Sequence, residues 1–357
     1  VELRNQLQSA AGGPSLPSAL VFDYPTVRQI MCMLEPEVSK KPTSAVDADA
    51  DAVLRDAVAA TTDADVTLDG VSTLLPSGAS SWQGVSCILR CRHDAVSQVP
   101  AARWDVHAQP ALSGRAASCV RHGSFVWGSE LADNGAFGVS PAEAAAMDPC
   151  QRLLLERGYM ALHDASLERT VLGGSLTGAF LGFAGSEFAQ VLAASPAGSS
   201  VYAATGSSSS IACGRISYVL GLHGACVSYD TACSSALAAY HAALRALQLD
   251  ECVTALVTSV AIMLAPGVGT SFAIAGMTSP RGRSHTFDGR ADGYARGEAC
   301  GGGVMSNGHE GAALCLLGSA VRQDGRSASL TAPNGQAQQG LLRGALQDAS
   351  LEARALS

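Results

Sequence analysis

The residues with the clearest chemical potential are the six from Asp230 to Ser235, which read Asp-Thr-Ala-Cys-Ser-Ser. An apolar, glycine-interrupted run at 216–227 precedes them and an alanine-rich pattern follows, so the sequence predicts a strand-to-helix corner with Cys233 near the first helical turn. Unpaired backbone N–H groups and the helix dipole favour a thiolate at such a position. A thiolate there would suit covalent, nucleophilic catalysis. The alternative interpretation is a small buried apolar side chain, the common fate of a free cysteine.

No partner for a catalytic dyad stands out near Cys233. His241 follows it by eight residues on the same expected helix, a rise of about 12 Å, which is too long for direct contact. His223 precedes the expected strand, and His285 and His309 lie in glycine-rich, turn-like stretches typical of a surface. The sequence also contains no Gly-x-Ser-x-Gly, His-Glu-x-x-His or phosphate-binding Gly-Lys-Ser/Thr motif. The cysteine corner is therefore the main candidate site.

Metal chemistry has a weaker signal. Cys87, Cys91 and His93 have a spacing that could hold a metal ion, but no second ligand pair follows. We interpret the two cysteines as buried members of a helix core and predict no metal site. The eleven cysteines are odd in number and irregularly spaced, which indicates reduced thiols in a cytoplasmic protein and not a disulfide framework.

Composition narrows the class of protein. Apolar residues make up 47% of the 357 positions and charged residues 15%, which fits a globular protein with a large core. The net charge is −8 without a basic stripe, so we expect no nucleic-acid partner. Residues 252–280 carry no charged side chain, but Thr, Ser and Gly interrupt them and Pro266 splits them. A strand buried on both faces at 253–264 explains this segment better than a membrane span.

The elements that must position Cys233 follow an alternating pattern. Short apolar strands, glycine-rich turns and alanine-rich helices predict an α/β layered fold. Six blocks in one order then resemble β-ketoacyl synthase (ketosynthase) domains of modular type I polyketide synthases, and Asp230–Ser235 resembles their active-site signature. The blocks are 138–152, 213–218, 230–235, 275–280, 287–298 and 323–335. This resemblance implies a thiolase-like fold, here its N-terminal half only, with Cys233 as the acyl-accepting nucleophile.

Three zones are expected along the chain. Residues 1–36 resemble the C-terminal part of an acyl carrier protein domain, a helical remnant. In that family the serine that bears phosphopantetheine would lie before residue 1, so we expect no cofactor on this chain and phosphopantetheine on carrier domains of the parent protein. Residues 37–65, rich in Ala, Asp, Lys and Pro, predict a linker. Residues 66–357 would be the ketosynthase portion.

The resemblance implies 3-oxoacyl-[acyl carrier protein] synthase chemistry. An acyl group moves onto the cysteine as a thioester, a malonyl-type unit loses CO₂, and a decarboxylative Claisen condensation joins the two. In the family, two histidines support this, one in a His-Gly-Thr-Gly-Thr motif and one in a later glycine–histidine motif. Neither motif lies within residues 1–357, so we expect this truncated chain alone to be inactive. Implied partners are acyl carrier protein domains with acyl and malonyl-type thioesters, and a second copy in a homodimer.

A second function class must be weighed: a non-catalytic scaffold, or the product of a truncated or decayed gene. Two departures from the family pattern favour it. Asp69 lies within the expected first strand, and glycines at 301–303 replace an apolar strand, so both places predict weakened local structure. Asp292, Arg296 and Glu298 are interpreted as one partly buried charged network that holds the loop near the cysteine.

Overall fold

A computed structural model describes residues 66–108, 114–308 and 314–355, and every structural statement below refers to these ranges. The chain divides into two compact units, one from Ala64 to Cys315 and another that contains Leu316–Ser357. The carrier-protein remnant expected at 1–36 and the linker expected at 37–65 lie outside the described residues.

The larger unit alternates strands and helices. Its elements are β1 (Val66–Leu74), η2 (Pro76–Gly78), α5 (Trp82–Arg90), β2 (Ser97–Gln98), α6 (Gly114–Cys119), β3 (His122–Gly123), η3 (Gly135–Phe137), α7 (Pro141–Ala146), α8 (Pro149–Asp164), α9 (Arg169–Leu172), β4 (Thr177–Gly182), α10 (Phe188–Ala193), η4 (Pro196–Ser199), α11 (Ala203–Gly206), α12 (Ser209–Leu220), β5 (Cys226–Tyr229), η5 (Ala232–Ser234), α13 (Ser235–Gln248), β6 (Thr254–Ala261), α14 (Gly267–Ile274) and β7 (Ala299–Asn307).

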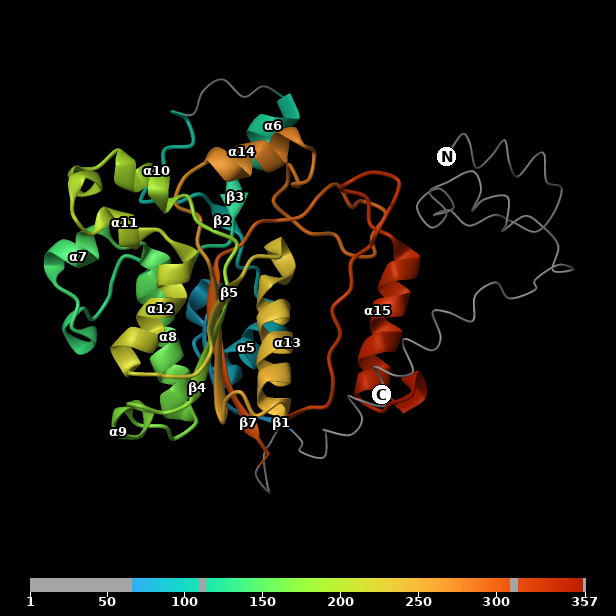
Figure 1. The fold of residues 1–357 in the computed structure, drawn as a ribbon. Helices are drawn as coiled ribbons and strands as arrows, with labels where there is room; N and C mark the ends of the chain where they lie inside the picture. The colour runs from blue at the N-terminus through green and yellow to red at the C-terminus, as the bar shows by residue number, and fades with distance from the viewer. Residues whose placement is uncertain (1–65, 109–113, 309–313, 356–357) are drawn as a thin grey trace, which may run out of the picture. The chain divides into compact units, whose positions relative to one another are not determined.

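A mixed sheet forms the centre of this unit. Its strands lie in the order β5-β4-β6-β7-β1. Strand β4 is parallel to β5 and to β6, whereas β7 is antiparallel to both β6 and β1. Helices α8 and α12 pack on one face of the sheet and α13 packs on the other (Figure 1). This layering confirms the α/β prediction and places the start of α13 beside the ends of the parallel strands.

The core explains why the central strands are apolar. All six residues of β4 are buried, and most of β6 is buried too, as expected for parallel strands covered on both faces. Leucines from α8, such as Leu153 and Leu162, pack against them with Leu256. Strand β6 confirms the buried strand predicted near 253–264. In the described ranges, no helix combines the length and the apolar character that crossing a membrane requires.

The apolar run at 216–227 forms the predicted strand only at its end, because its first residues belong to a helix. Residues 209–220 form α12, and only Cys226–Tyr229 is a strand. Gly221, with φ of 70°, ends the helix in the left-handed conformation. Glycine commonly ends helices in this way. Here it divides one apolar run into the end of α12 and the later strand β5, a division that hydrophobic periodicity does not predict.

Both departures from the family pattern are accommodated. Strand β7 forms despite its three glycines and pairs with β1 and β6. A side chain at Gly303 would place its Cβ 2.3 Å from the hydroxyl of Tyr240 on α13, so glycine there makes room for the helix. Asp69 lies at an irregularity of β1, and its carboxylate accepts hydrogen bonds from the hydroxyls of Thr67 and Ser306. Both segments therefore form strands, with hydrogen bonds and close packing in place of the missing apolar side chains. The weaker local stability expected from the sequence stays a prediction.

The second unit is described by itself. It contains α15 (Gly335–Asp348) and η6 (Ala353–Ala355), and β8 (Cys315–Leu316) lies at its boundary. The Asn334 side chain caps α15 by accepting from the Gln336 N–H at 3.1 Å, and it donates to the Asp324 carbonyl at 3.1 Å. This contact joins the two halves of the block at 323–335.

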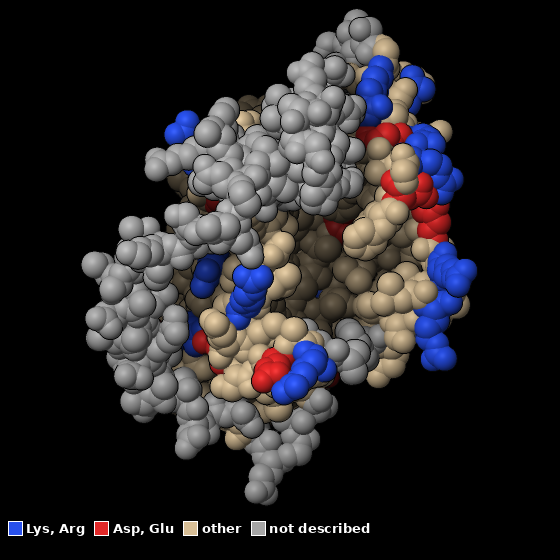
Figure 2. Space-filling model, turned by 90° about the vertical axis from the view of Figure 1, so that its right-hand side faces the viewer, with Lys and Arg blue, Asp and Glu red and all other residues tan. Residues whose placement is uncertain are grey.

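Charged side chains of opposite sign mix on the surface. On the face in Figure 2, acidic side chains lie among the basic ones. Among the described residues, Arg283 pairs with Asp94 at 2.7 Å and Arg290 with Asp288 at 2.6 Å. Exposed pairs of this kind stabilise a fold only slightly.

Candidate active site

Cys233 lies at the predicted corner. Strand β5 ends at Tyr229, η5 carries Cys233, and α13 begins at Ser235. Ala232 has φ of 54°, a left-handed conformation that non-glycine residues rarely adopt. Such strained strand-to-helix turns raise a nucleophile above the sheet. Cys233 is exposed, so the alternative of a buried apolar cysteine is wrong.

Hydroxyl and carboxylate groups hold the turn rigid. Asp230 Oδ1 accepts from the Ala232 N–H at 3.1 Å, and Ser235 Oγ donates to the Ala232 carbonyl at 2.7 Å. Ser235 Oγ also accepts from the Thr231 N–H at 2.9 Å, and Ser234 Oγ donates to the Thr231 carbonyl at 2.8 Å. Serine is a common residue at the start of a helix, where its hydroxyl caps free N–H groups. Ser234 does occupy the N-cap of α13, but its side chain makes no cap hydrogen bond; the hydroxyls fix the preceding turn instead.

The end of β4 approaches this corner closely. A Cβ on Gly182 would lie 2.6 Å from the Ala236 backbone nitrogen in the first turn of α13. Gly182 is paired with Tyr229, the last residue of β5. Only glycine therefore allows the helix start to rest on the strand ends.

Tyr294 is a neighbour of Cys233 that sequence reasoning missed. Burial raises the pKa of the Tyr294 phenol, the Arg296 guanidinium opposes that shift, and a negative charge on Cys233 would add to it. The three groups therefore share one electrostatic environment. The Tyr294 backbone is fixed by hydrogen bonds to Met277 and Ser279, at 3.1 and 3.0 Å. In the sequence, only the position of Tyr294 within the block at 287–298 indicated that this residue could lie near Cys233.

Glu298 holds together the loops around the site. Its carboxylate, with a side chain 0% exposed, accepts from Arg103 Nε at 3.2 Å and Nη2 at 3.0 Å. It also accepts from the backbone N–H groups of Val126 and Met263, at 2.8 and 2.9 Å. One buried carboxylate thus fixes segments that are far apart in the sequence.

The predicted network of Asp292, Arg296 and Glu298 is not one network. Asp292 accepts from Ser279 at 2.7 Å and forms an ion pair with Arg281. Arg296 lies 3.9 Å from Glu187 and over the ring of Phe272, while Glu298 pairs with Arg103. Each of the three has its own partner because they point from the loop in different directions. The prediction that such pairing is structural agrees with these contacts.

Side chains of the two upstream blocks, 138–152 and 213–218, contact each other. Arg215, from the block at 213–218, donates to Gln151 Oε1 at 3.1 Å and pairs with Glu143. Asp148 is fully buried and accepts a hydrogen bond from Ser186. Burial raises the pKa of the Asp148 carboxyl. These contacts position α8 and α12, which support the sheet below Cys233.

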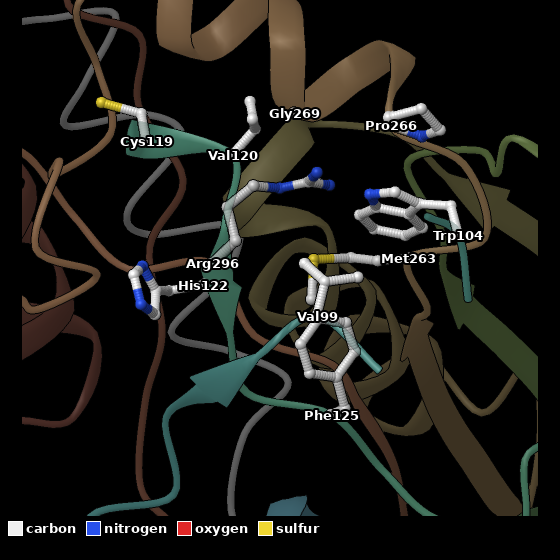
Figure 3. A pocket seen from close by; sticks show the side chains of 10 residues that line it. All are labelled: Val99, Trp104, Cys119, Val120, His122, Phe125, Met263, Pro266, Gly269 and Arg296. Carbon is white, nitrogen blue, oxygen red and sulfur yellow. The ribbon is translucent and has the colours of Figure 1, made fainter. Parts of the chain in front are cut away.

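A small cavity lies beside the Arg296 loop. Its volume is about 20 Å³, room for roughly one water molecule, so an acyl chain does not fit inside it. In Figure 3 the Arg296 guanidinium points toward the indole of Trp104, whereas Cys119 and His122 point away. The buried Trp104 Nε1 has no hydrogen-bond partner among the described residues.

The other candidate groups stay apart from the corner. His241 lies on α13 eight residues after Cys233, and His309 falls outside the described residues. Cys87 and Cys91 are both exposed, so their interpretation as helix-core cysteines is wrong. In the described ranges, no group of three or more His, Cys, Asp or Glu side chains is arranged to hold a metal ion.

Cys226 on β5 is a thiol with a lowered pKa. A hydrogen bond from the Cys213 thiol lowers the pKa of Cys226 to about 6, while the same contact and burial raise the pKa of Cys213. We predict that Cys226 alkylation by iodoacetamide reaches its half-maximal rate near pH 6. In a Cys213→Ala variant the profile should move to higher pH, because the donor is lost. Mass spectrometry of the Cys226 peptide measures this, and an unchanged profile contradicts it.

Comparisons with known proteins agree on one family. The family described as β-ketoacyl synthase, N-terminal domain, matches residues 63–310. Polyketide synthase GfsB of Streptomyces halstedii is 39% identical over 99% of this chain, and pikromycin polyketide synthase component PikAII of Streptomyces venezuelae is 39% identical over 98%. The chain spans only 6% and 9% of those proteins.

Solved structures give the same result for the fold. The ketosynthase from module 6 of the bacillaene synthase of Bacillus subtilis 168 superposes with a TM-score of 0.74 at 30% identity, over 82% of this chain and 50% of that one. The oxazolomycin ketosynthase domain OzmH KS7 of Streptomyces albus JA3453 gives 0.73 at 29% identity, over 80% and 52%. The predicted thiolase-like α/β fold is confirmed.

Proposed function

Because this chain belongs to the β-ketoacyl synthase family, we propose that Cys233 accepts an acyl group from a thioester donor. The Cys233 thiolate attacks the acyl carbonyl, a new C–S bond forms, the donor C–S bond breaks, and the donor leaves as a thiolate that takes up a proton. The observation that carries this proposal is the exposed cysteine on a left-handed turn at the start of α13.

We assign the Cys233 N–H as a donor to the oxyanion that forms during transfer. The N–H groups of Thr231 and Ala232 are engaged by Ser235 and Asp230, and that of Ser234 donates to the Thr231 carbonyl at 3.2 Å. The N–H group between those of Ala232 and Ser234 belongs to Cys233, the proposed nucleophile itself. A donor held rigidly at a developing charge is the usual source of rate enhancement in acyl transfer.

The condensing step would follow from the family chemistry. A malonyl-type unit loses CO₂, and the resulting carbanion attacks the Cys233 thioester, which releases the cysteine and forms the 3-oxoacyl product. The His-Gly-Thr-Gly-Thr motif does not occur within residues 1–357, and no glycine–histidine pair follows His309. The inactivity expected of this stretch of chain alone therefore concerns the condensing step, whereas the transfer of an acyl group to Cys233 is proposed to proceed without these motifs.

The proposed partners are carrier domains and a second copy of this chain. The acyl donor would be the phosphopantetheine thioester of an acyl carrier protein domain, with no cofactor bound by this chain. For the homodimer we place the contact at β5, the outermost strand of the sheet order, where Cys226 and Val227 are exposed. An unpaired strand edge is a ready surface for pairing with another copy.

The remaining assignments rest on the sequence. We propose a carrier-protein remnant at 1–36, a linker at 37–65, a ketosynthase portion at 66–357 and a cytoplasmic location. The scaffold or decayed-gene alternative is not favoured, because the strained turn at Ala232 and the buried support at Glu298 are both intact.

Acylation of the purified chain tests the proposal. The protein is incubated with a radiolabelled acyl thioester of pantetheine, digested, and its labelled peptide identified. We expect the label on the Cys233 peptide and its release by hydroxylamine, which cleaves thioesters. Label on another cysteine would contradict the proposal, and a chain that takes up no label would favour the scaffold.

A further inference from the structure

We propose that Cys87 and Cys91 form a two-thiolate site for a soft divalent cation such as Zn²⁺ or Cd²⁺, on the outer surface of α5. The two sulfur atoms lie 3.9 Å apart, and both residues are exposed. This site is separate from Cys233 and does not rest on the proposed function.

The helix backbone brings the two thiols together. Cys91 is the C-cap residue of α5, and its N–H donates to the Cys87 carbonyl at 2.8 Å. The two residues are therefore one turn apart on the same side of the helix. The convergence of their side chains needs no contact from another element.

The sulfur separation fits a metal ion. In tetrahedral zinc sites the Zn–S distance is about 2.3 Å, which sets two sulfurs about 3.8 Å apart. The observed 3.9 Å lies close to this value, so the ion can bind without a change of backbone. Thiolate sulfur selects soft and borderline ions over Mg²⁺ and Ca²⁺.

A disulfide fits the same geometry poorly. It requires Cβ atoms about 3.5–4.5 Å apart, whereas residues four apart on a helix have Cβ atoms about 5–6 Å apart. Closing the bond would distort the last turn of α5. An ion bridges the longer gap without that cost.

The site has two protein ligands. His93 is exposed nearby in the sequence, but the described residues contain no arrangement of three or more donors. Water would fill the remaining positions of the ion. Binding is written as two thiols plus M²⁺ giving a bis-thiolate complex plus two protons, so affinity rises with pH as the thiols ionise.

Cadmium titration of the whole chain tests the site, with the near-ultraviolet thiolate-to-cadmium absorption as readout. We expect saturation at one equivalent, and loss of that stoichiometric signal in both Cys87→Ser and Cys91→Ser. The Cys315→Ser variant removes another exposed thiol and should bind as the wild type does. The Cys233→Ala variant should also bind normally, which keeps this test independent of the catalytic proposal.

A control variant tests whether binding depends on the spacing of the two thiols or only on the number of exposed thiols. The double variant Leu89→Cys, Cys91→Ser keeps the number of exposed thiols but moves one to a position two residues from Cys87, where side chains do not face each other. It should lose the signal. Equal binding by this variant, binding that survives Cys87→Ser, or isolation of the chain as a Cys87–Cys91 disulfide would overturn the proposal. All variants change exposed positions, and an unchanged melting curve shows that each is folded.

Discussion

Replacing Cys233 by alanine is expected to abolish acyl transfer to the chain while leaving its fold intact. Removing a covalent nucleophile lowers a rate by a factor of about 10⁴ or more. The side chain is exposed, so we expect the free energy of unfolding to change by no more than about 0.5 kcal/mol. The measurements are the initial rate of label uptake from a radiolabelled acyl thioester and a denaturant titration.

Two variants serve as controls for this result. Cys226→Ala removes another exposed thiol near the corner and should leave labelling of Cys233 unchanged. Cys233→Ser keeps the shape of the nucleophile but should label far more slowly, because a hydroxyl ionises much less readily than a thiol. Uptake by Cys233→Ala at the wild-type rate would show that the acyl group goes elsewhere.

Replacing Glu298 by alanine is expected to lower the free energy of unfolding by about 3–5 kcal/mol. The change leaves Arg103, whose side chain is only 12% exposed, without its buried partner. It also removes the acceptor for the N–H groups of Val126 and Met263. Unpaired buried donors keep their full desolvation cost. Denaturant titration monitored by circular dichroism measures the loss.

The matched control is a surface ion pair of the same type. Asp288→Ala breaks the exposed pair with Arg290, and we expect no measurable shift of the unfolding midpoint. Glu298→Gln keeps an acceptor oxygen but loses the charge opposite Arg103, so its midpoint should fall between wild type and Glu298→Ala. If Glu298→Ala unfolds at the wild-type midpoint, the carboxylate does not hold these loops.

Local sequence was sufficient for the class of fold and for the corner. Alternating apolar and glycine-rich stretches predicted the α/β layers, and the residues before and after Cys233 predicted a turn into a helix. Both depend on neighbours within a few residues, which is the range over which propensity and periodicity act. The motif blocks gave the family in the same way. The acyl-accepting role of Cys233 stays a prediction.

The prediction of element boundaries from hydrophobic periodicity failed where a single residue divides an apolar run. Gly221 ends α12 and leaves β5 only four residues, a boundary that hydrophobicity alone cannot show. The prediction that Cys87 and Cys91 are buried also failed, since both are exposed. The type of a residue predicts only its average environment, and not which face of α5 meets the core.

The sequence alone determined the chemistry available at the corner, since Cys233 and its turn residues are adjacent in the chain. Tertiary structure decided what surrounds it. Arg103 and Glu298 are 195 positions apart, and Tyr294 reaches the electrostatic environment of Cys233 from a distant loop. Such contacts arise when strands and helices pack into one core, and no local pattern records which distant segments will meet.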